Sequence, residues 1–451
     1  MKFSYDLYNK LILDKIIQYS SEIYSFKRKY NFNYFPLITR MLRIHHGTMT
    51  SIDSFKIISR SKSLNDLFRC SKNSKNDFEI NINFSTYIKS FLSYIVLKYR
   101  VFLIPKNGVV IAIHQAKFIN YINSSRLFDN IHIVWLVFEK IDFPAKNLKK
   151  DQFILCRKIS FRLTKGIFPI NYCDDTYKCL FLYIKCIKPK ALFTLEGDAP
   201  YQIQLSNVCK ELGIKNFCFQ WGLLHKYKSQ TAFSNMSFTS FLSWGSFFSE
   251  QLKPLNPDQK FLDFGHLCLS SSRSKGDKIL ILDQGAEIPT IPKSHIEKYY
   301  NLITLLSSKY IGKLIFRQHP QCPLEPNIIN GFKSSNIEIS DSAKCVSVDL
   351  NRAKIAISIM SSSLLDAFVH GVIPVSFKYD HFEAYPLPLN ELEIGFESND
   401  IYELFKFVSE LMSSNTKYVK YKHNVVNKRK FIFSENTTEQ RVSLLNDLIE
   451  V

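Results

Sequence analysis

A histidine and an arginine mark the end of one apolar run in the second half of the sequence. Residues 316–320 read FRQHP, so Arg317 and His319 stand where a strand is expected to end and a loop to open. Ligands of parallel α/β sheets collect at such strand ends. A guanidinium and an imidazole there could neutralise the charge on a departing phosphate, and Pro320 stiffens the turn.

Three consecutive serines follow another apolar run, residues 355–359. They are Ser361, Ser362 and Ser363. A helix is expected over 364–370, and hydroxyls with free first-turn N–H groups at a helix start attract anions. Asp366 in the first turn can accept hydrogen bonds from a ribose, and Gly371 is expected to cap the helix. A plain N-cap is the alternative for the serines, but two clusters at neighbouring strand ends favour a nucleotide site.

Carboxylates at other strand ends could act as a general base. The segment LEGD holds Glu196 and Asp198, and Gly197 lets the backbone turn sharply between them. We expect Glu196 to be the base, with Asp198 as the alternative. His114, at the end of GVVIAIHQ, is a further candidate for an acceptor-side or base residue, although a polar core or loop histidine is the commoner outcome for such a position.

Metal and disulfide sites are not expected. Asp174 and Asp175 have no clear strand before them, and Cys173, Cys179 and Cys186 lack the short paired spacing of zinc ligands. The sequence begins without a secretory signal pattern, so the ten cysteines are interpreted as reduced thiols of a cytoplasmic protein. We therefore predict a metal-independent protein with no cofactor.

The elements that would position these residues alternate between short apolar runs and amphipathic stretches, which predicts parallel α/β sheets. Two such series are separated by the polar stretch 270–277, which predicts two doubly wound domains facing a central cleft. The expected strands are 109–113, 131–138, 191–195, 216–219, 241–243, 278–282, 313–317, 337–339, 355–359 and 372–377, and the expected helices include 201–212 and 438–449. The expected domains are a mainly helical region 1–107, a first Rossmann-like domain 108–269, a second 277–425, and a C-terminal helix 426–451.

The net charge of +19 predicts an anionic partner: nucleic acid, acidic lipid or a phosphate-bearing donor and acceptor. Residues 417–430 contribute six basic side chains and no acidic one, which is either a solvated face or a patch that attracts anionic lipid. No run reaches the ~18 apolar residues that span a bilayer. At most a peripheral association with the inner face of the cytoplasmic membrane is expected.

The second-half motifs carry a family resemblance. FRQHP, together with SIMSSSLLDAFVHGVIPV, resembles the His-Pro and Ser-Ser motifs of bacterial GT-B transferases that use CMP-activated sugars, the sialyltransferases and Kdo transferases. The resemblance implies that His319 and the three serines bind the nucleotide phosphate. It also implies an inverting transfer to a capsule polysaccharide or lipopolysaccharide, on an oligosaccharide or lipid-linked acceptor.

A second resemblance lies in the first domain. Residues 195–222 are similar to the strand, helix, strand and Gln-His-Gly pattern of capsule and teichoic-acid polymerising transferases, which places Gln220 and Gly222 on the acceptor side. Trp221 stands where that pattern has histidine. LEGD and LDQG (282–285) both contain parts of the acidic motif of CMP-sialic acid transferases, and Asp283 with Gly285 would line the cleft on the donor side.

Three functions remain open at this point. The first is a glycosyltransferase that uses a CMP-linked nonulosonic acid or Kdo, or a UDP-sugar. The second is a CDP-polyol phosphotransferase of the teichoic-acid type. The third is a nucleic-acid-binding protein, which the dispersed basic residues and the lack of a recognisable binding motif disfavour.

Overall fold

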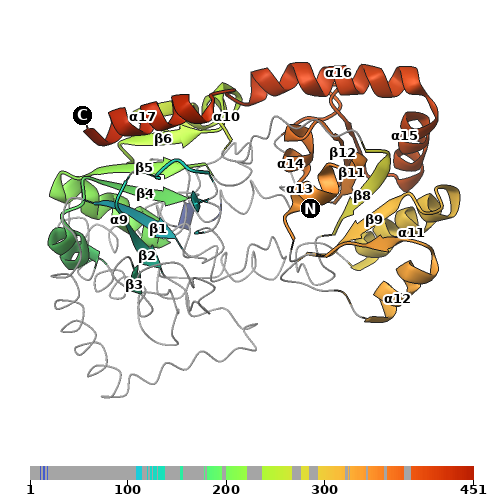
Figure 1. Cartoon of the computed structure of the whole chain (residues 1–451), viewed down its shortest axis with the longest axis horizontal. Helices are drawn as coiled ribbons and strands as arrows, with labels where there is room; N and C mark the ends of the chain where they lie inside the picture. Colours follow the sequence, from blue (N-terminus) through green and yellow to red (C-terminus); the bar gives the residue numbers. More distant parts are fainter. Residues whose placement is uncertain are drawn as a thin grey trace. The chain divides into compact units, whose positions relative to one another are not determined.

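The computed structural model divides the described residues into two compact units. Among the described residues, those from 11 to 266 and from 436 to 450 form the amino-terminal unit, and those from 276 to 435 form the carboxy-terminal unit (Figure 1). The structure describes residues 11, 14, 15, 18, 108–113, most of 119–137, 153–155 (backbone), 177, 180–195, 200–220, 236–266, 276–283, 293–319, 324, 326–341, 344–359, 363–379 and 387–450.

The amino-terminal unit is built on a seven-stranded parallel sheet in the order β3-β2-β1-β4-β5-β6-β7. The order runs outward from β1 in both directions, so the topological switch point lies between β1 and β4. The strands are β1 (Val109–Ile113), β2 (Ile133–Val137), β3 (Phe153–Leu155), β4 (Ala191–Leu195), β5 (Lys215–Phe219), β6 (Ser240–Ser243) and β7 (Phe261–Asp263).

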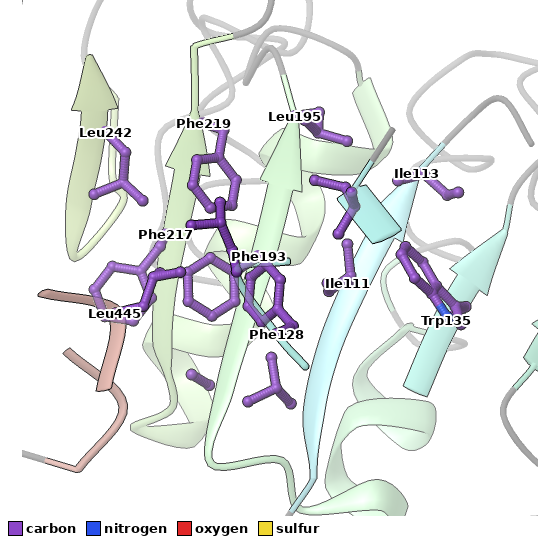
Figure 2. Packing of buried hydrophobic residues seen from close by; sticks show 14 of the residues in the cluster. Ile111, Ile113, Phe128, Trp135, Phe193, Leu195, Phe217, Phe219, Leu242 and Leu445 are labelled. Atoms are coloured by element: carbon purple, nitrogen blue, oxygen red, sulfur yellow. The ribbon is translucent and has the colours of Figure 1, made fainter. Parts of the chain in front are cut away.

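Both faces of this sheet are covered by helices. Alternate side chains of each strand point to opposite faces, so each strand contributes to two separate hydrophobic clusters. Val110, Ala112 and Leu192 pack on one face with helix α9 (Pro200–Leu212) and the helical residues 180–187. On the other face, Ile111, Phe193 and Phe219 join a cluster that includes Leu445 of α17 (Thr438–Glu450), as Figure 2 shows. The last helix of the chain therefore completes the core of the amino-terminal unit.

The carboxy-terminal unit repeats this topology in a six-stranded parallel sheet, with the order β10-β9-β8-β11-β12-β13. Its switch point lies between β8 and β11. The strands are β8 (Lys278–Leu282), β9 (Leu314–Arg317), β10 (Glu338–Ile339), β11 (Ala353–Ser358), β12 (Ile373–Phe377) and β13 (Phe396–Ser398).

Helices follow most of these strands. The carboxy-terminal unit contains α11 (Lys293–Lys309), α12 (Pro326–Ser334), α13 (Val346–Leu350), α14 (Ser363–Val369), α15 (Ile401–Ser413) and α16 (Asn415–Ile432). In the amino-terminal unit, α10 (Ser246–Leu252) and the 3-10 helix η2 (Lys253–Leu255) connect β6 to β7. None of the described helices is long and apolar enough to cross a membrane.

The fold class expected from the sequence is confirmed in both units, and β1, β4 and β8 have the expected bounds. β3 and β13 were not expected, because each is a three-residue strand at the edge of its sheet and lacks a long apolar run. The mainly helical region 1–107 lies almost wholly outside the described residues. The domain limits and the cleft between domains stay predictions.

Candidate functional site

Three of the predicted chemical segments meet at one edge of the carboxy-terminal sheet. Leu282 of β8 pairs with Arg317 of β9, and Ile281 pairs with Ile357 of β11. The carboxyl ends of these parallel strands therefore lie side by side, and the residues that follow them include Asp283, His319 and Ser363. This edge contains the switch point between β8 and β11, where ligands of doubly wound sheets bind.

His319 lies two residues beyond β9 and is half-buried. The residue before it helps to shape the loop, because the Gln318 Oε1 accepts a hydrogen bond from the Leu324 N–H at 3.2 Å. The place of His319 just beyond β9 agrees with the sequence prediction of a histidine at this strand end.

The Arg317 side chain makes its contacts with residues that follow β10 and with helix α13. Its Nη1 lies 2.8 Å from Asp349 Oδ2, and the two side chains are only 11% and 6% exposed. The same guanidinium donates to the Ser340 hydroxyl at 3.3 Å and to the carbonyls of residues 341 and 344. Its charge is thus largely balanced within the protein, and these contacts tie the end of β9 to the β10–β11 connection.

Asp283 directly follows β8 and is 6% exposed. Its backbone N–H donates to the Arg317 carbonyl at 3.0 Å, which continues the ladder by one residue. Burial, and secondly the charge of Asp283, raises the pKa of the hydroxyls of Tyr299 and Tyr300 on α11. A carboxyl group therefore lies at the end of β8, where it can accept hydrogen bonds from hydroxyl groups.

Ser363 begins α14, and Asp366 lies one turn further along that helix. Burial raises the pKa of the Asp366 carboxyl to about 6. Gly371 has φ +70°, which confirms the predicted cap, since this left-handed conformation favours glycine. Two cations bind the carbonyls at this end: Lys422 Nζ donates to Gly371, and Arg429 Nη1 donates to Val369 at 3.1 Å.

The corresponding edge of the amino-terminal sheet carries Gln220, directly after β5. Its side chain is 1% exposed, and its Oε1 accepts a hydrogen bond from the Trp244 N–H at 2.9 Å. The Trp244 ring lies against His266, with ring centroids 4.4 Å apart, and Arg441 of α17 donates to the His266 carbonyl at 2.9 Å. Gln220 therefore ties together the ends of β5 and β6, and His266 extends this cluster past β7.

Two predicted residues follow, in the sequence, the strands β1 and β4 that border the amino-terminal switch point, and the structure does not describe the placement of either residue. His114 and Glu196 directly follow β1 and β4 in the sequence, and these strands are neighbours. Gln202 of α9 donates to the carbonyl of Leu195, the last residue of β4. The predicted residues outside the described ones are His114, Glu196, Asp198, Gly222, Gly285, Pro320, Ser361 and Ser362.

Sequence reasoning missed several residues around these edges. Asp349 lies on a short helix 32 positions after its partner Arg317, and no motif joins the two. Tyr299 and Gln202 look like ordinary helix positions, yet the Tyr299 hydroxyl donates to the Ile357 carbonyl at 3.0 Å, close to the end of β11. His266 lies in the sequence FGHL. The glycine before it, Gly265, could have indicated a turn after the strand, and its φ of +95° shows that this turn needs a glycine.

Metal ligands are not clustered in the part of the chain that the structure covers: no group of three or more His, Cys, Asp or Glu side chains there could hold an ion. The same covered part contains no disulfide: its four cysteines, Cys186, Cys209, Cys218 and Cys345, are all thiols. Whether the chemistry requires a metal stays a prediction from the sequence.

A scan of protein-family profiles and a search of curated proteins found no match. Solved structures are similar over most of the chain. A UDP complex of S. aureus MnaA has 10% identity and a TM-score of 0.51, and the match covers 76% of this chain and 96% of that one. A UDP-N-acetylglucosamine 2-epimerase has 12% identity and a TM-score of 0.52, with 77% and 96% covered.

A third similar structure is that of a variant of Os79 from O. sativa in complex with UDP. It has 10% identity and a TM-score of 0.51, and the match covers 76% of this chain and the whole of that chain. Structural similarity at such low sequence identity shows the fold and nothing more. Both parallel sheets have the strand order 3-2-1-4-5-6, and the amino-terminal sheet adds β7 as a seventh strand. Together with this likeness, the two sheets show that the chain has the GT-B fold.

Proposed function

We propose that the chain is a glycosyltransferase that transfers a sugar from a nucleotide-activated donor. The observation that carries the proposal is the arrangement of His319, Asp283 and Ser363 after three neighbouring strands, β9, β8 and β11, at a switch point. In this proposal the donor occupies the carboxy-terminal unit. The acceptor is held by the strand ends of the amino-terminal unit.

The reaction we propose is an inverting transfer. An acceptor hydroxyl attacks the anomeric carbon, a base removes its proton, and the bond from that carbon to the nucleotide phosphate breaks with its electron pair leaving on the phosphate. His319 and the serines, Ser363 among them, would stabilise that charge. Asp283 would accept hydrogen bonds from donor hydroxyls, because a carboxylate repels phosphate. Glu196, or else Asp198, remains our candidate for the base.

Two observations favour different nucleotides in the donor. The His-Pro and Ser-Ser motifs resemble those of CMP-sugar transferases and favour sialic acid, another nonulosonic acid, or Kdo. The similar structures of MnaA and Os79 hold UDP, which favours a UDP-sugar. We propose a growing bacterial surface polysaccharide or lipopolysaccharide as the acceptor, and a reaction that needs no metal.

Donor binding tests the proposal directly. Purified protein is titrated with CMP-, UDP- and CDP-linked donors, and nucleotide release is then followed with and without candidate acceptors. We expect micromolar to millimolar affinity for one class, which is the usual range. His319→Ala should lower turnover by about a hundredfold or more, because it removes a group that stabilises the leaving phosphate.

His132→Ala is the matched control, because His132 is a half-buried histidine that directly precedes β2, at the amino end of that strand in the other unit. Equal loss in both variants, or no nucleotide bound by the parent protein, would contradict the proposal.

A second pair of variants tests the base. Glu196→Gln should lose turnover and keep donor affinity, and the control is Glu250→Gln, which changes an exposed carboxyl on α10. Phosphate in the polymer product would instead indicate polyol-phosphate transfer.

Epimerisation of a UDP-amino sugar is a second candidate. The likeness to a UDP-N-acetylglucosamine 2-epimerase favours it. Incubation of the protein with UDP-N-acetylglucosamine alone, analysed by NMR of the anomeric and C2 protons, separates the two. A change of configuration at C2 without any acceptor would support the epimerase and contradict the transferase.

A further inference from the structure

Helix α16 carries the strongest local concentration of positive charge in the described chain. Residues 415–432 contain six lysines and arginines and no acidic residue. None of these side chains is among the residues that we propose for the donor site. Their contacts sort them into an inward group and an outward group.

The inward group is engaged by the fold. Lys417 pairs with Glu410 and lies 5.0 Å over the Phe407 ring, and Lys422 and Arg429 bind the carbonyls after α14. Val425 and Ile432 on the same side are fully buried. These three cations therefore hold α16 against the unit and offer little charge to a partner.

The outward side of α16 is a continuous exposed stripe. Its members recur at spacings of three and four residues, so they share one face of the helix. This outer stripe consists of Val419, Lys420, His423, Asn427, Lys430 and Phe431. Lys428 lies beside it, also exposed, with its Nζ 5.8 Å from the Phe431 ring. The stripe is about 20 Å long at the rise of an α-helix.

Apolar side chains within the outer stripe narrow the kind of partner. Val419 is 54% exposed and Phe431 is 55% exposed, and each has basic neighbours on the stripe. A helix face that combines lysines with exposed aliphatic and aromatic groups suits a lipid headgroup region, where the apolar groups enter the acyl boundary and the ammonium groups reach phosphate. A nucleic-acid backbone would use the charge but bury neither apolar group.

The carboxylates near the stripe do not cancel its charge. Glu393 lies 3.2 Å from Lys420, and Glu435 lies 3.9 Å from Lys430. In both pairs more than a third of each side chain is exposed, and such surface pairs are weak and screened by salt. Both lysines can therefore exchange their partner for a lipid phosphate.

We propose that the outer stripe of α16 docks the protein on an anionic lipid bilayer. The proposal rests on the contacts of α16 alone and does not depend on the donor site. It predicts that the interaction needs both acidic headgroups and the apolar residues of the stripe, and that it weakens as salt is raised.

The test uses the full chain and sedimentation with vesicles of phosphatidylcholine, with and without phosphatidylglycerol. We expect binding to the anionic vesicles only. The triple variant Lys420→Gln, Lys428→Gln and Lys430→Gln should bind on the order of a hundredfold more weakly, since each basic residue near the surface contributes about fivefold. Phe431→Ser should weaken binding about tenfold with charge unchanged.

The control is a triple variant with the same change in charge at exposed lysines elsewhere: Lys210→Gln, Lys298→Gln and Lys333→Gln. It should bind vesicles much as the parent does. Equal losses in the two triple variants would mean that net charge alone acts, and would overturn the proposal. Vesicle binding that survives the α16 changes, or α16-dependent binding of a short nucleic-acid duplex without vesicle binding, would overturn it as well.

Discussion

Arg317 and Asp349 form a buried ion pair, with Nη1 and Oδ2 2.8 Å apart, between the end of β9 and helix α13. Ser340 joins it, because its hydroxyl donates to the same Asp349 oxygen at 2.5 Å. The arginine next to the candidate phosphate site is thereby tied to the β10 side of the sheet. We expect its contribution to the site to be the geometry of the strand end that leads to His319.

Breaking this ion pair should cost stability more than donor affinity. Asp349→Ala leaves a buried guanidinium without its counter-charge, so we expect the free energy of unfolding to fall by about 3 kcal/mol. Urea denaturation measures it. The control is Glu338→Ala, which breaks the exposed Arg352–Glu338 pair and should cost about 1 kcal/mol or less. Donor affinity lost in Arg317→Met with stability retained would show that Arg317 contacts the donor after all.

Continuous apolar runs explain why so much of the fold could be predicted. β8, with sequence KILIL, is buried on both faces of its sheet, and such strands stand out against their polar flanks. β13, with sequence FES, is an edge strand whose pairing with β12 determines its conformation. Local pattern therefore predicts the central strands well and the edge strands poorly.

The candidate site could be predicted as strand ends but not as contacts. Because parallel strands end at a common edge, the positions of His319 and Ser363 after apolar runs were sufficient to predict that both follow strand ends at this edge. The direction of the Arg317 side chain depends on Asp349, which is distant in the sequence. Likewise, the amphipathic pattern over α17 predicts that these residues form a helix, but it does not predict which of the two sheets the helix packs on.

Two serines near the end of β11 should separate a binding role from a packing role. Ser363→Ala removes a hydroxyl at the site edge, and we expect the donor KM to rise about tenfold with little change in stability. Ser358 is fully buried and donates to the Leu282 carbonyl at 2.8 Å. Ser358→Ala should instead lower the free energy of unfolding by about 1 kcal/mol and leave the KM unchanged. Steady-state kinetics and thermal denaturation distinguish these outcomes; identical effects in both variants would contradict the assignment of Ser363.

Asp366 should make the protein less stable as the pH rises. Its folded pKa is about 6, above the ordinary value for the residue, so the folded state holds the proton more tightly than the unfolded state does. Stability from this group is present at low pH and is lost as the pH rises from the unfolded pKa through about 6. Asp366→Asn should therefore raise the melting temperature at neutral pH.

The same substitution should weaken donor binding if the carboxylate contacts the donor, since groups with a shifted pKa concentrate at functional sites. Melting temperatures of parent and variant, compared across the window below and above pH 6, measure the first effect. Titration with donor at neutral pH measures the second. A variant that gains stability and keeps full donor affinity would assign Asp366 to the fold alone.

Helix α17 should be required for the stability of the amino-terminal unit, although it comes from the other end of the chain. Leu445 is fully buried in the cluster that contains Phe193, Phe217 and Phe219 (Figure 2), and Asn436 Nδ2 donates to the Asp263 carbonyl at 2.9 Å. Leu445→Ala leaves a cavity against this sheet, so we expect a loss of about 3 kcal/mol.

Amide hydrogen exchange locates the effect of Leu445→Ala. The amides of β4 and β5 should exchange faster, whereas those of β8 and β11 should keep the parent rate, because Leu445 packs only in the amino-terminal core. Ser443→Ala, at an exposed position of the same helix, is the control and should change neither set. Faster exchange in β8 and β11 as well would mean that the two units unfold together, and unchanged exchange in β5 would remove α17 from the core of the amino-terminal unit.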